Sequence, residues 1–384
     1  MKNIAIFCDG TWQNLSQRFP TNVTRLARAV APRKPARGDE PETTQVIFYD
    51  DGVGVGEGVA NEATRLIGGA LGKGLDRKIC EAYEFLCLNY CLGDGVFVFG
   101  FSRGAYTARS LAGLLRKCWI LRRENIGSVE EAVRIYRDHS KDAIETQLFK
   151  RNMCYSADAF TAVRSPDPKD AGKAAAAREN DWGCIRYVGV WDTVGALGVP
   201  HGLPFADAFN DRYRFHDTNL SRFVLSARHA VAIDERRATF PPTLWTNVDG
   251  LNINAGAANI PYDKRPYQQS WYPGRHSAIG GGEEDHGVSI PPLLWIAEGA
   301  RAAGLAFDDS LMAVYANSAN ASAPFADQVR SVADFLITIT GEEDRKGPEN
   351  FLEISDAARA RWRSLKDYRP KPIARFANQL NSLN

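Results

Sequence analysis

A serine lies between two glycines in the stretch GFSRG, where Gly100, Ser102 and Gly104 fit the pattern Gly-x-Ser-x-Gly. The apolar residues before it predict a buried strand, and residues 103–117 have the apolar spacing of a helix. In this strand-turn-helix context the pattern forms a nucleophile elbow, a strained turn whose glycines relieve crowding. We therefore expect Ser102 to be a nucleophile for acyl transfer. The alternative is an ordinary glycine-rich turn between a strand and a helix.

A nucleophilic serine needs a general base, and that base needs a carboxylate to orient it. In hydrolases with such an elbow, the chain order is serine, then Asp or Glu, then His. Asp192 fits because it follows the apolar run 185–191. A predicted strand therefore ends beside it, and α/β folds place reactive groups at such ends. Its alternative role is a turn or helix-capping residue before Thr193.

Five histidines follow Asp192, and His276 is the preferred base. It follows the short aromatic strand expected at SWYPG, and a loop after a late strand is where such hydrolases hold their histidine. His286 is the second choice. The other three histidines are less suitable. His201 is too close in sequence to Asp192, and His216 and His229 are expected in or beside a helix, where they would have structural roles.

The oxyanion of the reaction intermediate needs backbone N–H donors. Arg103 follows the serine at the start of the predicted helix, so its N–H is one candidate. The turn after the first predicted strand supplies the second candidate, from Gly10 or Thr11. Asp9 precedes them and is expected either to border this site or to organise the turn through an Asx-type bond.

Ester hydrolysis by a serine, a histidine and an aspartate requires no metal ion and no organic cofactor. Asp9, Asp50 and Asp51 lie near predicted strand ends, so a structural cation is an alternative for that group. The glycine run GVGVGEG lacks the G-x-G-x-x-G spacing of dinucleotide sites, which favours a loop bordering the pocket. The seven cysteines are scattered without a CxxC pair, so we expect free thiols rather than a zinc site.

The elements that would position these residues alternate along the chain. Continuously apolar strands between helices predict an α/β fold of the α/β-hydrolase type, a mostly parallel sheet with helices on both faces and insertions. Strands are expected at 3–8, 45–50, 95–100, 185–191 and near 270. Helices are expected at 21–31, 63–92, 103–117, 128–150, 219–234, 291–304 and 324–339. Residues 246–270 are expected to be largely irregular, and the tail 367–376 an extended arm.

The chain has 384 residues, of which 44% are hydrophobic and 24% charged, as in ordinary globular proteins. We expect one domain over 1–384, with candidate lid segments at about 120–182 and 246–270. The net charge of +1 gives no reason to expect a nucleic-acid partner. The first apolar run is too short for a secretory signal and no 18-residue apolar run occurs. We therefore expect a cytoplasmic chain, or one exported by a signal-independent system, of unassigned oligomeric state.

Six stretches, in order, carry a resemblance to a known family: NIAIFCDGTWQN, YDDGVGVG, GFSRGAYTARSLAGLL, VGVWDTVGALG, HAVAIDERRATFPPTLW and WYPGRHSAIGGG. The resemblance spans roughly residues 3–300 and is to the DUF2235 family, the catalytic domain of bacterial Tle1-like type VI secretion phospholipase effectors. The resemblance implies an α/β-hydrolase that cleaves phospholipid esters, with a membrane-surface contact. It implies a triad of Ser102, Asp192 and His276 and maps the family's FCDGT turn onto Cys8–Thr11.

Pattern and resemblance together predict a serine hydrolase that cleaves carboxylic esters through an acyl-enzyme, most specifically a phospholipase or lipase. Two alternatives stay open, namely an esterase for soluble small-molecule or carbohydrate esters, and a non-catalytic interaction module that retains the fold. Four aromatic residues beside the site residues are candidates to line the substrate pocket or, alternatively, to pack in the core: Trp12, Trp191, Trp271 and Tyr272.

Overall fold

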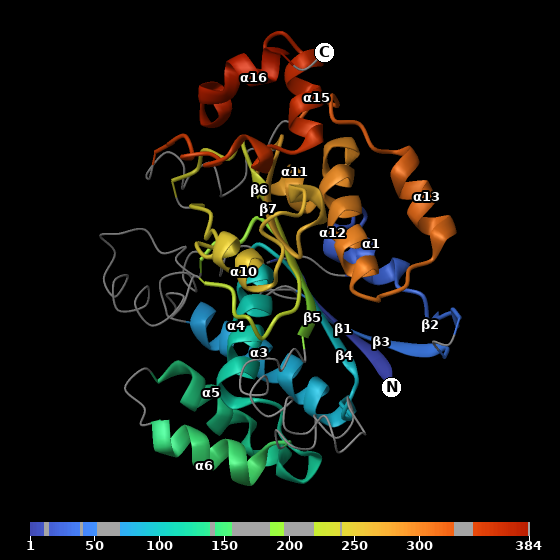
Figure 1. Cartoon of the computed structure of the whole chain (residues 1–384), viewed down its shortest axis with the longest axis vertical. Coiled ribbons are helices and arrows are strands. Elements are labelled where there is room, and N and C mark those ends of the chain that lie inside the picture. Colours follow the sequence, from blue (N-terminus) through green and yellow to red (C-terminus); the bar gives the residue numbers. More distant parts are fainter. Residues whose placement is uncertain are drawn as a thin grey trace.

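The computed structural model describes residues 1–10, 15–38, 41–51, 70–138, 143–155, 185–195, 219–238, 240–325 and 341–382. Within these ranges seven strands form one sheet in the order β2-β3-β1-β4-β5-β6-β7 (Figure 1). Every neighbouring pair is parallel except the short β2 against β3. The expected α/β fold with a mostly parallel sheet is therefore confirmed.

The elements have the following bounds. The strands are β1 Lys2–Cys8, β2 Arg33–Lys34, β3 Thr43–Asp50, β4 Gly95–Phe101, β5 Ile185–Trp191, β6 Ala227–Ala232 and β7 Tyr267–Tyr272. The α-helices are α1 Asn22–Ala29, α3 Ala70–Asn89, α4 Arg103–Cys118, α5 Val129–Arg137, α6 Ala143–Met153, α10 Val248–Asn254, α11 His276–Gly280, α12 Ile290–Ala302, α13 Asp309–Asn317, α15 Asp356–Ser364 and α16 Ala377–Ser382. Short 3₁₀ helices cover Arg123–Ser128, Tyr262–Lys264, Gly287–Ser289, Phe351–Glu353 and Lys371–Phe376.

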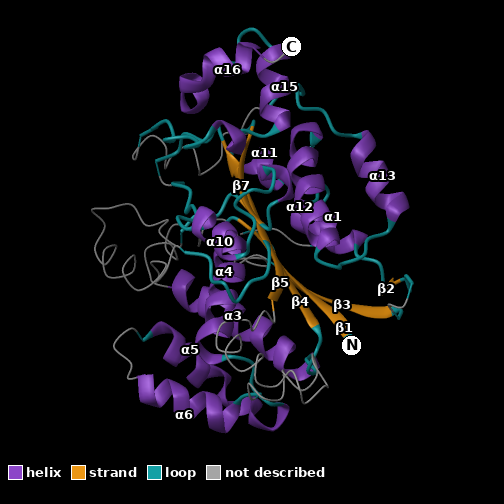
Figure 2. Cartoon of the chain, viewed as in Figure 1, coloured by secondary structure: helices purple, strands orange, loops and turns teal. Residues whose placement is uncertain are grey.

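The central strands β1, β4 and β5 are mostly apolar because helices cover both faces of the sheet (Figure 2). Along β1, Ile4 and Ile6 belong to one core cluster with buried residues of α3 and α4. Phe7, which faces the other way, belongs to a second cluster with residues of α1 and α12. There its ring stacks on that of Phe99 with 4.7 Å between centroids. This alternation holds the middle of the sheet, and hence the ends of β4 and β5, in a packed core.

A third core cluster lies at the β7 edge of the sheet, where the C-terminal helices α15 and α16 pack (Figure 1). It joins Val231 of β6 and Trp271 of β7 to Trp362 and Ile373. Ile354 also forms a parallel bridge with Trp271. The last part of the chain is therefore built onto the sheet beside the ends of β6 and β7.

The predicted helix at 219–234 is wrong, because residues 227–232 form the buried strand β6. This run, ARHAVA, is rich in alanine, which favours helices locally. Its position between β5 and β7 overrides that preference, since a strand there completes the backbone hydrogen bonds of both neighbours. Tertiary context thus decides the element.

Other expected elements need smaller corrections. The helix expected at 128–150 is two helices, α5 and α6. The stretch 246–270, expected to be irregular, contains α10 and the start of β7, and the expected extended arm includes the 3₁₀ helix Lys371–Phe376. Residues 52–69, the first part of the helix expected at 63–92 among them, and residues 326–340 lie outside the described residues.

The described parts of the two candidate lid segments pack on the fold. Val133 and Ile135 of α5 are buried in the cluster that contains β4 and α4. Asn252 of α10 donates to the carbonyl of Tyr267, the first residue of β7, at 2.9 Å. Residues 156–184 lie outside the described residues. A lid role for these segments stays a prediction.

Candidate active site

Three of the expected residues meet at the C-terminal ends of parallel strands. Ser102 follows β4, Asp192 follows β5 and His276 begins α11 after β7. The Oγ of Ser102 lies 2.8 Å from Nε2 of His276. The Nδ1 of His276 lies 2.6 Å from Oδ2 of Asp192. The structure therefore brings a hydroxyl, an imidazole and a carboxylate into one hydrogen-bonded series.

The turn at Ser102 is strained, and its glycines are required by close packing. Ser102 has φ 58° and ψ −122°, which an L-residue rarely adopts. A Cβ on Gly100 would lie 2.4 Å from the Gly104 carbonyl oxygen. A Cβ on Gly104 would lie 2.1 Å from the carbonyl oxygen of Cys8. Each side of the serine therefore needs a residue without a side chain, which is the physical content of the Gly-x-Ser-x-Gly pattern here.

Asp192 is fully buried, yet four donors hold its carboxylate. Oδ1 accepts from the backbone N–H of Ala232 at 2.9 Å and from Nη1 of Arg345 at 2.6 Å. Oδ2 accepts from His276 and from Nη2 of Arg345 at 3.0 Å. Burial alone raises the pKa of Asp192, but the charge of Arg345 and the His276 bond outweigh it. The pKa therefore lies well below its ordinary value, and the group stays ionised.

His276 is held between two aromatic rings. Its ring centroid lies 4.7 Å from that of Phe101 and 5.0 Å from that of Phe240. Its backbone N–H donates to Oε2 of Glu235 at 3.1 Å. Burial lowers the pKa of His276, and the bond and charge of Asp192 only partly oppose that effect. The imidazole is therefore neutral at pH 7 and free to accept a proton from the serine.

Two residues at this site, Arg345 and Glu235, are not predicted from the sequence. Arg345 lies in the polar stretch GEEDRKGPEN, which carries no motif that would single it out. Glu235 lies in the stretch HAVAIDERRATFPPTLW, which resembles the family, but the resemblance implies no role for this residue. It pairs with Arg237 at 2.8 Å as well as capping the His276 N–H. Arg345 and Glu235 reach the site only because folding brings segments that are far apart in the chain together.

The Asp9 carboxylate organises the turn after β1 through its own hydrogen bonds. Oδ1 of Asp9 accepts from the Gly10 N–H at 2.6 Å, so a role for this N–H as an oxyanion donor requires that bond to open or be shared. Oδ2 accepts from three hydroxyls, those of Thr21 at 2.6 Å, Thr24 at 3.0 Å and Tyr49 at 2.5 Å. Burial raises the pKa of Asp9 in spite of these bonds. The Gly10 role stays a prediction.

Other oxyanion and cation candidates stand as follows. Arg103 is the first residue of α4, and its role as an oxyanion donor stays a prediction. Thr11 lies outside the described residues.

Asp50, one of the three candidates for a cation site, pairs with the amino group of Lys78. Burial raises the pKa of Asp50 to about 6. Within the described ranges no group of three or more His, Cys, Asp or Glu side chains is arranged to hold a metal ion.

The two other histidines within the described residues, His229 and His286, form hydrogen bonds with groups other than Ser102. His229 is buried in β6, where Nδ1 lies 3.1 Å from Oε1 of Gln269 and Nε2 accepts from the Thr193 N–H at 3.2 Å. Burial lowers its pKa to about 3, so this histidine is neutral and structural as expected, although in a strand. His286 Nδ1 lies 3.1 Å from the Glu284 carbonyl oxygen. His201 and His216 lie outside the described residues.

The aromatic candidates for the pocket wall are core residues where the structure describes them. Trp191 and Tyr272 belong to the cluster under α12, and Trp271 belongs to the cluster under α15. Trp12 lies outside the described residues. The six described cysteines are free thiols. No helix in the described residues is long and apolar enough to cross a bilayer.

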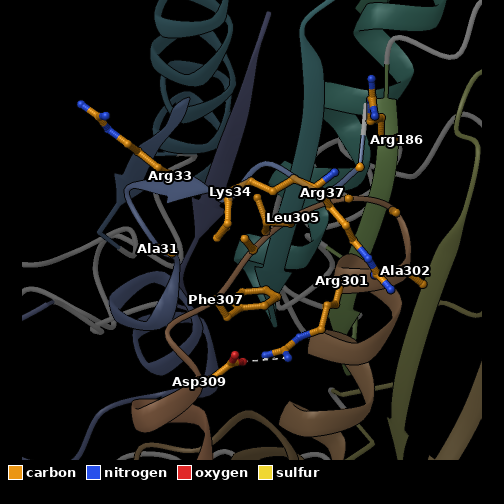
Figure 3. Close-up of a pocket in the computed structure, with 15 residues that line it drawn as sticks. Ala31, Arg33, Lys34, Arg37, Arg186, Arg301, Ala302, Leu305, Phe307 and Asp309 are labelled. Atoms are coloured by element: carbon orange, nitrogen blue, oxygen red, sulfur yellow. Dashed lines mark ion pairs between the residues drawn. The ribbon is translucent and has the colours of Figure 1, made fainter. Parts of the chain in front are cut away.

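A separate cleft of about 990 Å³ is lined by Arg186, near the start of β5 (Figure 3). Its walls come from residues 31–38, residues 301–309 and Arg186 near the start of β5, whereas Asp192 follows the end of that strand. Arg301 pairs there with Asp309 at 2.9 Å. The cleft is therefore separate from the site at Ser102.

The chain is similar to known proteins in sequence. Residues 2–299 match the family model described as the T6SS phospholipase effector Tle1-like catalytic domain. The uncharacterized protein YEL023C of Saccharomyces cerevisiae is 29% identical over 255 residues, which are 64% of this chain and 33% of that protein. This chain therefore spans about a third of the yeast relative.

Two solved structures are also similar. The Tle1 effector bound to the VgrG spike of the type 6 secretion system has 18% identity and a TM-score of 0.39, covering 74% of this chain and 52% of that one. An uncharacterized protein from Pseudomonas aeruginosa has 18% identity and a TM-score of 0.38, covering 84% and 51%. This chain spans about half of each. Because the family model covers well over half of the sequence, the chain belongs to the family of Tle1-like phospholipase effector catalytic domains.

Proposed function

We propose that this protein is a serine hydrolase that cleaves carboxylic esters of phospholipids through an acyl-enzyme. The observation that carries the proposal is the continuous series from Ser102 Oγ through the His276 ring to Asp192, with separations of 2.8 and 2.6 Å. A strained serine on an elbow, a neutral base and an ionised carboxylate are the three groups that such catalysis requires.

The first half of the reaction forms the acyl-enzyme. Nε2 of His276 removes the proton from Ser102 Oγ as that oxygen attacks the ester carbonyl carbon. The imidazolium then gives this proton to the leaving alcohol, and the C–O bond of the ester breaks. Asp192 keeps the Nδ1 proton in place and stabilises the positive ring.

The second half releases the fatty acid. A water takes the place of the alcohol, His276 removes its proton, and the hydroxide attacks the acyl carbon. The tetrahedral intermediate collapses, the bond to Ser102 breaks, and the serine recovers its proton from His276. In both halves the negative oxygen would be held by the N–H of Arg103 at the start of α4, with a second donor from the Gly10–Thr11 turn.

Phospholipid is the proposed substrate because the family is one of phospholipase effectors. Ser102 is only 8% exposed. An acyl chain must therefore reach the serine from a site that admits little solvent, which suits an apolar substrate.

Export by a type VI secretion system is also part of the proposal. Immunoblotting of culture supernatants from a host with and without the secretion apparatus would test it.

The test compares wild type with Ser102→Ala, and uses Ser382→Ala, at an exposed serine of α16, as the matched control. Each is given a fluorogenic phospholipid in mixed micelles and, separately, a short-chain p-nitrophenyl ester. We expect the wild type and Ser382→Ala to cleave phospholipid, and Ser102→Ala to lose at least roughly a thousandfold in kcat.

The other outcomes assign the alternatives. If wild type cleaves only the short ester, and Ser102→Ala does not, the enzyme is an esterase for soluble substrates and the phospholipid assignment is wrong. If Ser102→Ala equals wild type on both substrates, the serine mechanism is wrong. A wild type inert on both would leave an interaction module that retains the fold.

A further inference from the structure

We propose that Arg345 is a positioning residue that fixes the Asp192 carboxylate toward His276. The segment 341–355, beyond the matched family span, would thereby complete the site. This inference rests on the proposed function, because it assigns a support to the proposed triad. No sequence motif marks Arg345, and the hydrogen bonds of its side chain go to Asp192, Ala232 and Phe240 rather than to Ser102.

The guanidinium of Arg345 forms a two-pronged contact with the carboxylate. Nη1 lies 2.6 Å from Oδ1 of Asp192, and Nη2 lies 3.0 Å from Oδ2. The same nitrogens donate at 2.8 Å to the carbonyl oxygens of Ala232, at the end of β6, and Phe240. The Arg345 side chain is only 4% exposed, so these bonds are shielded from water. Two carbonyls thus fix the guanidinium, and the guanidinium fixes the carboxylate.

This arrangement determines which oxygen faces the imidazole. Oδ1 also accepts from the Ala232 N–H, while Oδ2 is the partner of His276 Nδ1. A rotation of the Asp192 carboxylate would break several of these bonds at once. A planar guanidinium can bridge both oxygens, whereas a lysine ammonium cannot match that geometry. Because buried ion pairs contribute little net stability, we assign to the Arg345–Asp192 pair the orientation of the Asp192 carboxylate rather than stabilisation of the fold.

The chain around Arg345 is itself anchored beside the site. The Glu343 N–H donates to the Arg236 carbonyl at 2.8 Å, and the Arg236 side chain pairs with Glu342 at 3.0 Å and Asp344 at 3.1 Å. Farther along, the Ser355 N–H donates to the Trp271 carbonyl at 3.0 Å. The segment is thus tied at both ends to the turn after β6 and to β7, the elements that also hold His276.

Arg345 also affects protonation of the proposed pair. Among the described residues, the other charged or titratable groups near Asp192 and His276 are Glu235 and Arg237 on the turn after β6, the neutral His229 in β6, and Arg109 on α4, which acts on His229. The positive charge of Arg345 disfavours binding of a proton by the Asp192–His276 pair. Removing it must therefore raise the apparent pKa of the pair, so that activity is lost at a higher pH on acidification.

The experiment uses the full chain with Arg345→Met, Arg345→Lys and, as the matched control, Arg363→Met at an exposed arginine of α15. For each, kcat and KM on a short-chain p-nitrophenyl ester are measured across pH, with thermal unfolding and labelling by a fluorophosphonate to count reactive serines. We expect Arg345→Met to lose roughly tenfold or more in kcat, with little change in KM. Its acidic limb should move up by about one pH unit or more.

The lysine variant separates charge from geometry. Because it keeps the charge, its acidic limb should stay near that of wild type, while kcat per reactive serine falls because the bridging contact is lost. It also covers the case in which Arg345→Met does not fold. Wild-type kcat and an unmoved acidic limb in the folded variants would overturn the positioning role. That result is distinct from failure of the proposed function, in which Ser102→Ala assayed alongside would equal wild type.

Discussion

Ser102 and His276 are separated by 174 residues, yet Oγ of one lies 2.8 Å from Nε2 of the other. The contact exists because β4, β5, β6 and β7 are neighbouring parallel strands, so the segments that follow them emerge at one edge of the sheet. The rings of Phe101 and Phe240 then confine the imidazole between them. The sheet supplies proximity, and the aromatic packing supplies orientation.

The pH dependence of activity should reflect the lowered pKa of His276. Burial disfavours the charged ring, so the ring stays neutral below the ordinary histidine value of about 6.5. Lowering the pH from 7 should therefore leave kcat/KM unchanged until the pH falls below about 6.5. The measurement is a kcat/KM profile on a short-chain p-nitrophenyl ester. An acidic limb at or above about pH 7 would show that Asp192 dominates over burial.

Replacement of the two histidine candidates should separate their roles. His276→Ala should reduce kcat by at least roughly a thousandfold, because the serine loses its base. His286→Ala should retain activity close to wild type, since this ring contacts the Glu284 carbonyl at 3.1 Å rather than Ser102. Initial rates on the same ester measure both. Equal losses in the two variants would contradict the assignment of the base.

Gly104→Ala should destabilise the elbow. The new Cβ would lie 2.1 Å from the Cys8 carbonyl oxygen, and both are backbone-anchored, so α4 or β1 must shift. We expect a loss of about 2 kcal/mol or more in unfolding free energy, measured by urea denaturation. Gly127→Ala is the matched control, because nothing lies within 4 Å of its added Cβ. A Gly104→Ala protein as stable as this control would refute the close packing.

The Asp9 cluster, which is the Asp9 carboxylate with the hydroxyls of Thr21, Thr24 and Tyr49, should contribute to the stability of the fold. Asp9→Ala leaves the hydroxyls of Thr21, Thr24 and Tyr49 without their shared acceptor, which should destabilise the fold by about 1–3 kcal/mol in urea denaturation. Asp309→Ala, at a side chain 84% exposed, should change stability by less than about 0.5 kcal/mol. Similar values for the two variants would mean that the cluster adds nothing.

The sheet and the three proposed site residues were accessible from sequence because their signals are local. Continuous apolar runs mark strands such as β4 and β5, buried on both faces, and Gly-x-Ser-x-Gly marks a turn that only small neighbours tolerate. The helix expected at 21–31 likewise has a local signal, and α1 covers Asn22–Ala29. In contrast, the sequence wrongly predicts a helix where β6 lies, because its alanines carry a helical preference that only the neighbouring strands override.

The amino-acid sequence alone thus determined the alternation of strands and helices, the elbow at Ser102 and the chain order of serine, aspartate and histidine. Only the tertiary structure decided which groups surround them. The contact between Asp192 and Arg345 spans 153 residues, and the bond from Asp9 to the Gly10 N–H competes with a donor role that the sequence suggested. The reason is physical, because hydrophobic periodicity is written along the chain, whereas the partners of a buried charge depend on which distant segments share its cavity.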